Sequence, residues 1–277
     1  MAPDESRGHG DDSGARLAAA ELYESEVVPN VLQVVAERLI DRAGVGQGHT
    51  VLDVGCGTGV VARECAHRVG PTGEVAGLDI SKEMLTVARR VAPDIEWIQG
   101  EAGLLPFGTG SFDRVLSQFA MMFFPDQSHA ISEMWRVLGV GGRLGVVVSG
   151  GLEDSPVNST LARIIDRRVG KEGLGAVEAI WTVGGESGWA QAFAAAGVDR
   201  VDVRTEHGTT EYPSIEAFVE AEVRGWSPIS ELVDDTTLTW LIDDARRELA
   251  FAVDTDGRLR FNPPYYAITA TKTGVDR

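Results

Sequence analysis

The segment VLDVGCGTG at residues 51–59 constrains the fold more than any other part of the sequence, because an apolar run leads directly into closely spaced glycines. Glycine reaches left-handed backbone conformations and lets the backbone approach a ligand closely. The start of the helix expected next offers unpaired backbone N–H groups to a ligand. The segment predicts a strand, a ligand-binding loop and a helix, a combination that several classes of nucleotide-binding protein share.

Strands and helices are expected to alternate on both sides of this loop. An amphipathic helix over residues 18–43, broken at Pro29, comes first. We expect strands at 50–54, 74–79, 95–98, 112–117 and 143–149, with helices at 60–69, 82–91 and 127–138. Strands separated by helices of about ten residues indicate a parallel sheet. After residue 150 the pattern predicts helices at 156–169, 188–196, 215–224 and 236–250, and strands at 198–205 and 265–271.

The fold predicted from this order is α/β: a Rossmann-like, seven-stranded, mostly parallel sheet with helices on both faces and helical lid insertions. Residues 17–277 are expected to form one domain, and the polar, acidic residues 1–16 a solvated tail. The segments 152–190 and 208–262 are long for connections, and long connections near a site are usually lids.

Charge and cysteine content narrow the class of protein. The net charge of −17, from 42 acidic and 25 basic residues, would repel a nucleic acid, so no nucleic-acid partner is expected. No membrane segment is expected, because no apolar stretch approaches 20 residues. Cys56 and Cys65 have neither disulfide nor metal-site spacing, which fits a reducing cytoplasm, and no metal site is expected.

Three features around the loop describe its ligand further. The glycines are spaced Gly55-x-Gly57-x-Gly59, which differs from the G-x-G-x-x-G of dinucleotide binders. Asp53 precedes them and would suit an ammonium group better than a pyrophosphate, although it could also cap the loop backbone. Asp79 ends the next strand, where a carboxylate can accept from both hydroxyls of a ribose.

Five segments in this order resemble one family: LDVGCGTG at 52–59, GLDIS at 77–81, GEAGLLPF at 100–107, SFDRVLSQFAMMFFPD at 111–126 and EMWRVLGVGGRL at 133–144. The chain resembles the class I S-adenosylmethionine (SAM)-dependent methyltransferases, in the branch of quinone and small-molecule methyltransferases. The resemblance covers roughly residues 20–150.

The resemblance implies a set of SAM-binding residues. It implies that the loop Gly55, Cys56, Gly57 and Gly59 passes beneath the methionine part of SAM, with Asp53 near its amino group. It further implies that Asp79 binds the ribose, that Ile80 packs on the adenine, and that Glu101 and the Ala102 backbone meet the adenine edge and ring. Position 101 is more often Asp in this branch. Ser117 and Gln118 should face the methionine end and the methyl acceptor.

The stretch FNPPYY at 261–266 contains an Asn-Pro-Pro-Tyr tetrad, which resembles the catalytic signature of enzymes that methylate amino nitrogens in DNA and protein amides. In those enzymes the tetrad follows the fourth strand, a place that SQFAMM occupies here. We therefore expect the two prolines to form a rigid entry into the last strand. Tyr265 or Tyr266 could still line the acceptor site.

No residue stands out as a general base for the acceptor. Tyr23, His207 and Tyr266 are the candidates, and His207 is as consistent with a bystander role as with a base. His129 is expected on a helix surface rather than in catalysis. The run Phe119, Met121, Met122, Phe123 and Phe124 is expected to form at least part of the acceptor pocket wall.

The sequence thus predicts a cytoplasmic SAM-dependent methyltransferase acting on a small molecule. Its arginine-rich, lysine-poor composition favours natural-product biosynthesis. Three alternatives stay open: a SAM-binding protein without methyl transfer, a macromolecular acceptor, and an NAD-dependent oxidoreductase, for which no Tyr-x-x-x-Lys pair is present. The acceptor, the atom methylated and a possible homodimer are not determined by the sequence.

Overall fold

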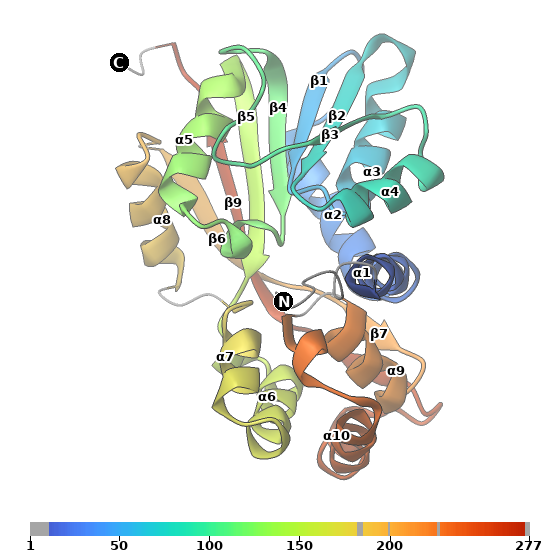
Figure 1. Cartoon of the computed structure of the whole chain (residues 1–277). Helices are drawn as coiled ribbons and strands as arrows, with labels where there is room; N and C mark the ends of the chain where they lie inside the picture. Colours follow the sequence, from blue (N-terminus) through green and yellow to red (C-terminus); the bar gives the residue numbers. More distant parts are fainter. Residues whose placement is uncertain (1–10, 182–184, 199, 226–227, 275–277) are drawn as a thin grey trace, which may run out of the picture.

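The computed structural model describes residues 11–181, 185–198, 200–225 and 228–274. Within them lies a seven-stranded sheet in the order β3-β2-β1-β4-β5-β9-β6 (Figure 1). Only β9 runs antiparallel to its neighbours in this sheet. The predicted seven-stranded, mostly parallel sheet is therefore confirmed. The strands are β1 Thr50–Val54, β2 Glu74–Asp79, β3 Glu96–Gln99, β4 Phe112–Gln118, β5 Leu138–Ser149, β6 Val201–His207 and β9 Pro264–Thr271.

Helices cover both faces of the sheet because the central strands are apolar on both sides. Leu116 and Val147 belong to the core under one helical layer, whereas Val115 and Val146 belong to the core under the other. This alternation is what buried parallel strands require. The first layer holds α2 Gln33–Ala43 and α3 Val60–Val69, the second holds α5 Gln127–Val137 and α8 Gly185–Ala195, and α4 Lys82–Val91 packs beside β2 and β3.

The N-terminal helix differs from the prediction. Helix α1, Asp11–Leu22, continues as the π-helical η1, Tyr23–Leu32, which contains Pro29 and leads into α2. Residues 11–16 of the predicted tail are therefore helical, and residues 1–10 lie outside the described residues. The reason is tertiary: α1 packs on α4, and Arg90 forms a 2.7 Å ion pair with Glu21.

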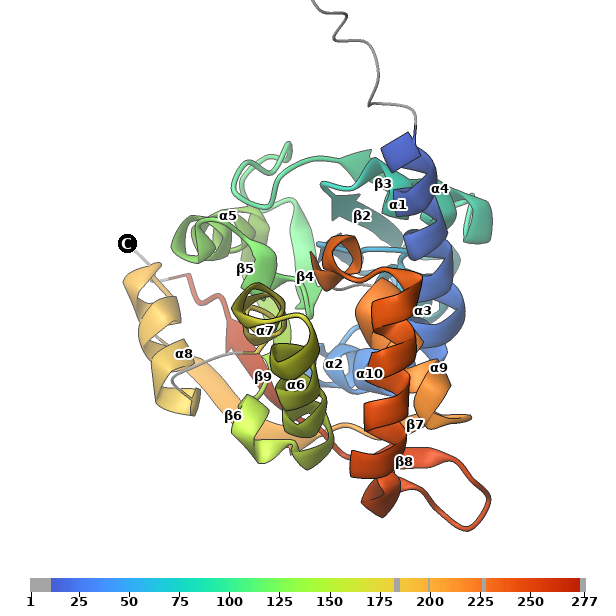
Figure 2. The ribbon, with the colours of Figure 1, turned by 60° about the horizontal axis from the view of Figure 1, so that its bottom comes forward.

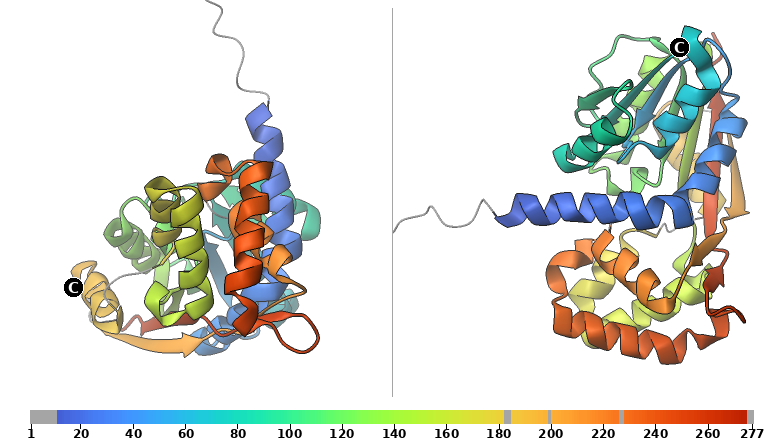
Figure 3. Two further views of the ribbon diagram at one scale, coloured as in Figure 1. Left: turned by 90° about the horizontal axis from the view of Figure 1, so that it is seen from below. Right: turned by 90° about the vertical axis from the view of Figure 1, so that its right-hand side faces the viewer.

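A layer of helices lies beyond the carboxyl ends of the parallel strands (Figures 1 and 2). In the right-hand view of Figure 3, α1 runs between the sheet and this layer. The layer and its hairpin contain α6 Pro156–Arg168, α7 Lys171–Glu178, β7 Thr210–Tyr212, α9 Ile215–Glu220, η5 Ala221–Gly225, η6 Pro228–Leu232, α10 Asp235–Glu248, η7 Ala250–Ala252 and β8 Leu259–Phe261. Short 3-10 turns complete the chain: η2 Gly70–Thr72, η3 Met121–Phe123 and η4 Leu152–Asp154.

The first predicted lid segment, 152–190, is too long. Its helices α6 and α7 belong to the layer, but α8 begins at Gly185 and packs on β6 at the edge of the sheet. Residues 182–184 lie outside the described residues. The described residues of the second segment, 208–262, all belong to the layer or its hairpin, so the layer consists of parts of both predicted segments.

Candidate functional site

The glycine loop connects β1 to α3 in the predicted place. Gly55, Gly57 and Gly59 have φ values of 69°, 54° and 92°, in the left-handed region that favours glycine. A Cβ atom on Gly55 would lie 2.4 Å from the Cβ of Ala120, and one on Gly59 would lie 2.2 Å from the ring of Trp97. The loop thus needs glycine for its backbone conformation and for its close contacts.

Asp79 joins this loop to the end of β2. Its Oδ2 accepts from the Gly57 N–H at 2.7 Å, and its Oδ1 accepts from the Ser81 N–H at 2.9 Å. Burial raises the pKa of Asp79, and the backbone donors offset part of that rise. Each oxygen keeps a second lone pair, so the carboxylate can still accept from a ligand.

Asp53 lies behind the loop and is almost fully buried. Its Oδ2 accepts from the Ala62 N–H in the first turn of α3 at 3.1 Å, whereas its Oδ1 has no hydrogen-bond partner in the structure. Burial raises the pKa of Asp53 to about 7. Asp53 is not among the residues that line the cavity described next. Its contact with α3 matches the alternative that Asp53 caps the backbone around the loop.

A cavity of about 1180 Å³ opens at the carboxyl ends of β1, β2 and β4, where open α/β sheets bind ligands. Gly55, Gly57 and Asp79 line it. The volume exceeds the roughly 300–1,000 Å³ of ordinary small-molecule sites, which leaves room for two ligands.

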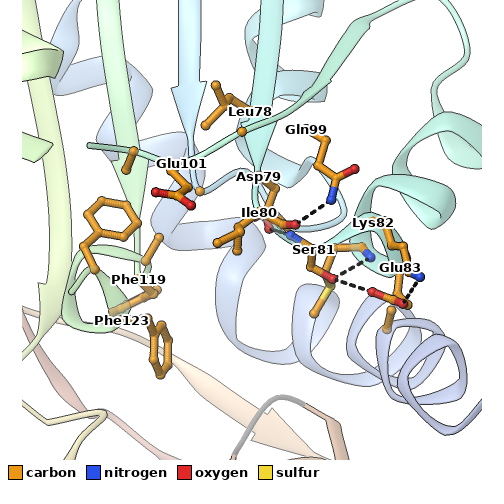
Figure 4. A pocket seen from close by; sticks show the side chains of 18 of the residues that line it. Leu78, Asp79, Ile80, Ser81, Lys82, Glu83, Gln99, Glu101, Phe119 and Phe123 are labelled. Atoms are coloured by element: carbon orange, nitrogen blue, oxygen red, sulfur yellow. Dashed lines mark hydrogen bonds and ion pairs between the residues drawn. The ribbon is translucent and has the colours of Figure 1, made fainter. Parts of the chain in front are cut away.

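One side of the cavity combines exposed apolar side chains with a carboxylate. The exposed fraction is 65% for Ile80 and 76% for Leu104, and both line the cavity together with Glu101 and Ala102. Figure 4 shows Ile80 and Glu101 close to Asp79. Gln99 fixes this turn, because its Nε2 donates to the Ile80 carbonyl at 3.1 Å.

Aromatic side chains form another wall. Phe119, Phe123 and Phe124 line the cavity, and Figure 4 shows Phe119 and Phe123 across it from Lys82. Met121 of the same run is fully buried in the core.

The two polar residues at the end of β4 differ in position. Gln118 lines the cavity and donates from Nε2 to the Leu32 carbonyl at 3.1 Å. Ser117 is fully buried and is not a lining residue. Cys56 is likewise buried and outside the lining, and burial raises the pKa of its thiol.

Of the three candidate bases, the structure brings only Tyr23 to the cavity. Its hydroxyl lies 3.5 Å from where a Cβ on Gly57 would stand. Burial, followed by the nearby carboxylates of Asp79 and Asp53, raises the pKa of Tyr23 well above its usual value. The phenol is therefore neutral at pH 7 and suited to donate a hydrogen bond, not to remove a proton.

His207 and Tyr266 do not line the cavity. His207 ends β6 at the edge of the sheet, and its carbonyl accepts from Arg38 at 2.8 Å. Tyr266 packs into the core beneath α5 and α8. The sequence indicated which strand ends these residues occupy, but not the strand order or the face of the sheet.

Several residues that line the cavity belong to no motif that indicates a binding site in the sequence. Arg16 and Ala20 of α1, Arg224 and Gly225 of η5, and Ser230 of η6 all line the cavity. His129, expected on a helix surface, is exposed but also lines the cavity. The amphipathic pattern of 18–43 could have suggested a site for α1, but nothing local marks η5 or η6.

The described residues contain neither a metal-binding group of side chains nor a membrane-spanning helix. These residues contain no group of three or more His, Cys, Asp or Glu side chains that could hold a metal ion. No helix among them is long and apolar enough to cross a membrane.

Strand order, the glycine loop and the carboxylate at the end of β2 together define an α/β protein with a nucleotide-binding type of site. Residues 51–142 match the family model described as "Methyltransferase domain". These residues thus carry the domain of the class I SAM-dependent methyltransferases, whose methyl donor is SAM.

Two curated relatives illustrate the sequence similarity. The ubiquinone/menaquinone biosynthesis C-methyltransferase UbiE of Hahella chejuensis is 41% identical over 114 residues, which cover 39% of this chain and 46% of the relative. Methyltransferase GfsG of Streptomyces halstedii is 40% identical over 129 residues, which cover 43% of this chain and 46% of the relative. The matched region thus spans less than half the length of each of these relatives.

A solved structure illustrates the similarity in fold. The YcgJ protein of Bacillus subtilis superimposes with a TM-score of 0.58 at 24% identity, over 86% of this chain and 97% of that protein. At this identity the likeness shows the fold alone.

Proposed function

We propose that this chain transfers a methyl group from SAM to a small organic acceptor. The observation that carries the proposal is a cavity that holds the glycine loop and Asp79 on one side and the aromatic wall of Phe119, Phe123 and Phe124 on another. A site with room for two ligands is what a bimolecular transfer requires.

The residues present fit SAM in this cavity. The Asp79 carboxylate has spare lone pairs for ribose hydroxyls, and Ile80 and Leu104 offer apolar surface to the adenine. Glu101 can accept from the adenine amine, and the Ala102 backbone lies beside it.

The methionine end would lie over Gly55 and Gly57, which both line the cavity. Tyr23 faces Gly57 and can donate from its neutral hydroxyl to the methionine carboxylate. Asp53 lies behind the loop, where its ionised form favours the ammonium group without direct contact. Gln118 separates this end from the acceptor, while Ser117, Cys56 and Gly59 support the loop and strand from outside the lining.

SAM supplies an electrophilic methyl group when it is bound. The task of the chain is then to hold the acceptor in line with the sulfur and to exclude water, and such alignment can itself contribute several kcal/mol. The η5 and η6 segments roof the cavity with Arg224, Gly225 and Ser230. Tyr23, one of the three candidate bases, is assigned here to a neutral donor role, because burial raises the pKa of its hydroxyl.

For the acceptor we propose a natural product rather than a respiratory quinone. The family model ends at residue 142, so the residues of η5 and η6 that roof the cavity lie outside it. The lysine-poor composition supports the same choice. A macromolecular acceptor is disfavoured by the net charge of −17 for nucleic acids and by a cavity walled on several sides for proteins.

The test is transfer of a labelled methyl group. The full chain is incubated with SAM that carries a deuterated methyl group, together with phenols, enols and amines of natural-product type, a protein mixture and DNA. We expect the label in a small-molecule product by mass spectrometry. Label only in protein or DNA, or SAM binding without any labelled product across a broad panel, would contradict the proposal.

A cytoplasmic location and a homodimer remain predictions. Cys56 and Cys65 are both buried free thiols, which fits a reducing compartment. Sedimentation equilibrium of the purified chain would test the dimer.

A further inference from the structure

Phe119 has an unusual backbone at the aromatic wall of the cavity. Its φ is 49°, and it is the only residue other than glycine with a positive φ in the described part of the chain. A bulky side chain is strained in this region, and such strain persists only where the surroundings impose it. Here the Phe119 N–H donates to the Val147 carbonyl at 2.8 Å, which fixes the residue against β5.

The ring of Phe119 is fixed as well. It meets the ring of Tyr265 edge to face, with centroids 6.3 Å apart and planes at 80°. Tyr265 is only 2% exposed and belongs to the Asn-Pro-Pro-Tyr tetrad at the start of β9. The tetrad thus supplies a buried support for a residue that lines the cavity.

Tyr265 is itself held by charged neighbours. Its hydroxyl donates to Glu206 Oε2 of β6 at 2.7 Å, and Arg38 Nη1 of α2 lies 3.4 Å from the same hydroxyl. Glu206 is also ion-paired with Arg42 of α2. The ring of Tyr265 is therefore fixed from both β6 and α2, and it can transmit that rigidity to Phe119.

The fixed phenyl ring of Phe119 contributes an aromatic, apolar surface to the wall of the cavity. Ala120, the next residue, lies against Gly55, so the aromatic wall adjoins the first glycine of the loop. Aromatic faces favour planar unsaturated rings over saturated ones, because rings attract one another beyond the effect of buried area.

We propose that Phe119 determines acceptor specificity by stacking on a planar, unsaturated part of the acceptor, and that Tyr265 is the positioning residue that holds it. This inference rests on the proposed function, since it assigns Phe119 to the acceptor rather than to SAM. It gives the Asn-Pro-Pro-Tyr tetrad a role in the site without contact with the reacting atoms.

The experiment uses two matched probes on the full chain saturated with S-adenosylhomocysteine: planar 1-naphthol and saturated decahydro-1-naphthol. Calorimetry is expected to show at least tenfold tighter binding of 1-naphthol by the native protein. Phe119→Leu should reduce this preference below threefold while the affinity for S-adenosylhomocysteine stays within threefold of native. Phe251→Leu, which changes an exposed phenylalanine of η7 outside the cavity lining, should keep the preference.

The positioning role has its own variants. Tyr265→Phe keeps the supporting ring and should retain the preference for 1-naphthol, whereas Tyr265→Leu removes the ring and should lower it at least threefold. Because Tyr265 is buried, Tyr265→Leu is interpreted only if it binds S-adenosylhomocysteine normally, and the Phe119→Leu result decides the proposal without it.

Equal or undetectable binding of the two probes by the native complex would overturn the inference. So would a preference that survives in Phe119→Leu. Failure of the native protein to bind S-adenosylhomocysteine would instead count against the proposed function.

Discussion

The Gly57 N–H donates a 2.7 Å hydrogen bond to Oδ2 of Asp79, and this bond ties the glycine loop to the end of β2. Both residues line the same cavity, so the contact fixes the shape of the site before any ligand enters. We expect Asp79→Asn to weaken S-adenosylhomocysteine binding by about tenfold or more, since hydrogen bonds to charged groups contribute about 1.5–3 kcal/mol. Calorimetric titration measures the change.

The control for Asp79→Asn is Asp113→Asn. Asp113 also accepts from a backbone N–H, that of Thr50 at 2.9 Å, but at the opposite end of the sheet. An equal loss of affinity in both variants would mean that Asp79 acts only through general stability.

Gly57→Ala should abolish cofactor binding, because its Cβ would enter the space beneath Tyr23. Gly48→Ala is the matched control: Gly48 also has a left-handed φ, of 76°, but it does not line the cavity. Both variants should lose about 1 kcal/mol of unfolding free energy through backbone strain. Unchanged S-adenosylhomocysteine binding in Gly57→Ala would contradict the assigned loop role.

Tyr23→Phe should raise the dissociation constant for S-adenosylhomocysteine about tenfold through loss of one hydrogen-bond donor. Because the pKa of Tyr23 is raised, its ionisation should not shape the methyl-transfer rate between pH 6 and 9. Rate profiles of the native protein and Tyr23→Phe should therefore have the same form. A basic limb that disappears in Tyr23→Phe would restore Tyr23 as the base.

The raised pKa of Asp53 predicts that the stability of the protein depends on pH. Its pKa rises from 3.8 to about 7 on folding, so its contribution to stability is full below pH 3.8 and is lost as pH rises through 7. Between these two pKa values the unfolding free energy of the native protein should fall by about 1.4 kcal/mol for each pH unit. Asp53→Asn keeps an acceptor for the Ala62 N–H but does not titrate in this range. The unfolding free energy of the variant minus that of the native protein should therefore increase between pH 5 and 8. A constant difference across this range in urea denaturation would show that the pKa of Asp53 is not raised.

Asp244 of α10 links this helix to α6 in the layer beyond the carboxyl ends of the strands. It is 2% exposed and accepts from Arg168 of α6 at 2.6 and 2.9 Å and from Arg167 at 3.1 Å. Asp244→Asn should lower the unfolding free energy by about 2 kcal/mol, less than for a fully buried pair because both arginines are partly exposed. Asp243→Asn, which removes an exposed pair with Arg246, should change it by about 0.5 kcal/mol or less. Equal effects of the two variants would contradict a structural role for the Asp244 cluster.

The sequence was most informative where local chemistry decides the structure. The strand and helix around the glycine loop, at 50–54 and 60–69, have the predicted bounds, because apolar runs and glycines act locally. The prolines of FNPPYY do precede a strand, and β9 begins at Pro264.

The sequence was less informative where tertiary contacts determine the structure. Helix α7 was not predicted, since Gly173 and Gly175 lower its helix propensity, and packing on α6 and η6 supports it. Strand β5 begins at Leu138 rather than Arg143, because Leu138 already pairs with Phe112 of β4 and the register shifts before Arg143 pairs with Arg114. The three-residue strands β7 and β8 are too short to show a pattern.

The candidate site divides in the same way. The loop and the residues that follow β2, β3 and β4 could be assigned from sequence because each adjoins a strand end. Arg224 and Ser230 could not, since only the path of the helical layer brings them over the cavity. His207 does not line the cavity, because β6 is an edge strand, separated from β4 by β5 and β9.

Calorimetric titration of the purified chain with S-adenosylhomocysteine, beside NAD⁺ under the same conditions, is the most direct test that this cavity is a SAM site. We predict one equivalent bound with micromolar affinity and no heat of binding for NAD⁺. Binding of NAD⁺ with none of S-adenosylhomocysteine would contradict the assignment of the cavity and, with it, the proposed methyl transfer.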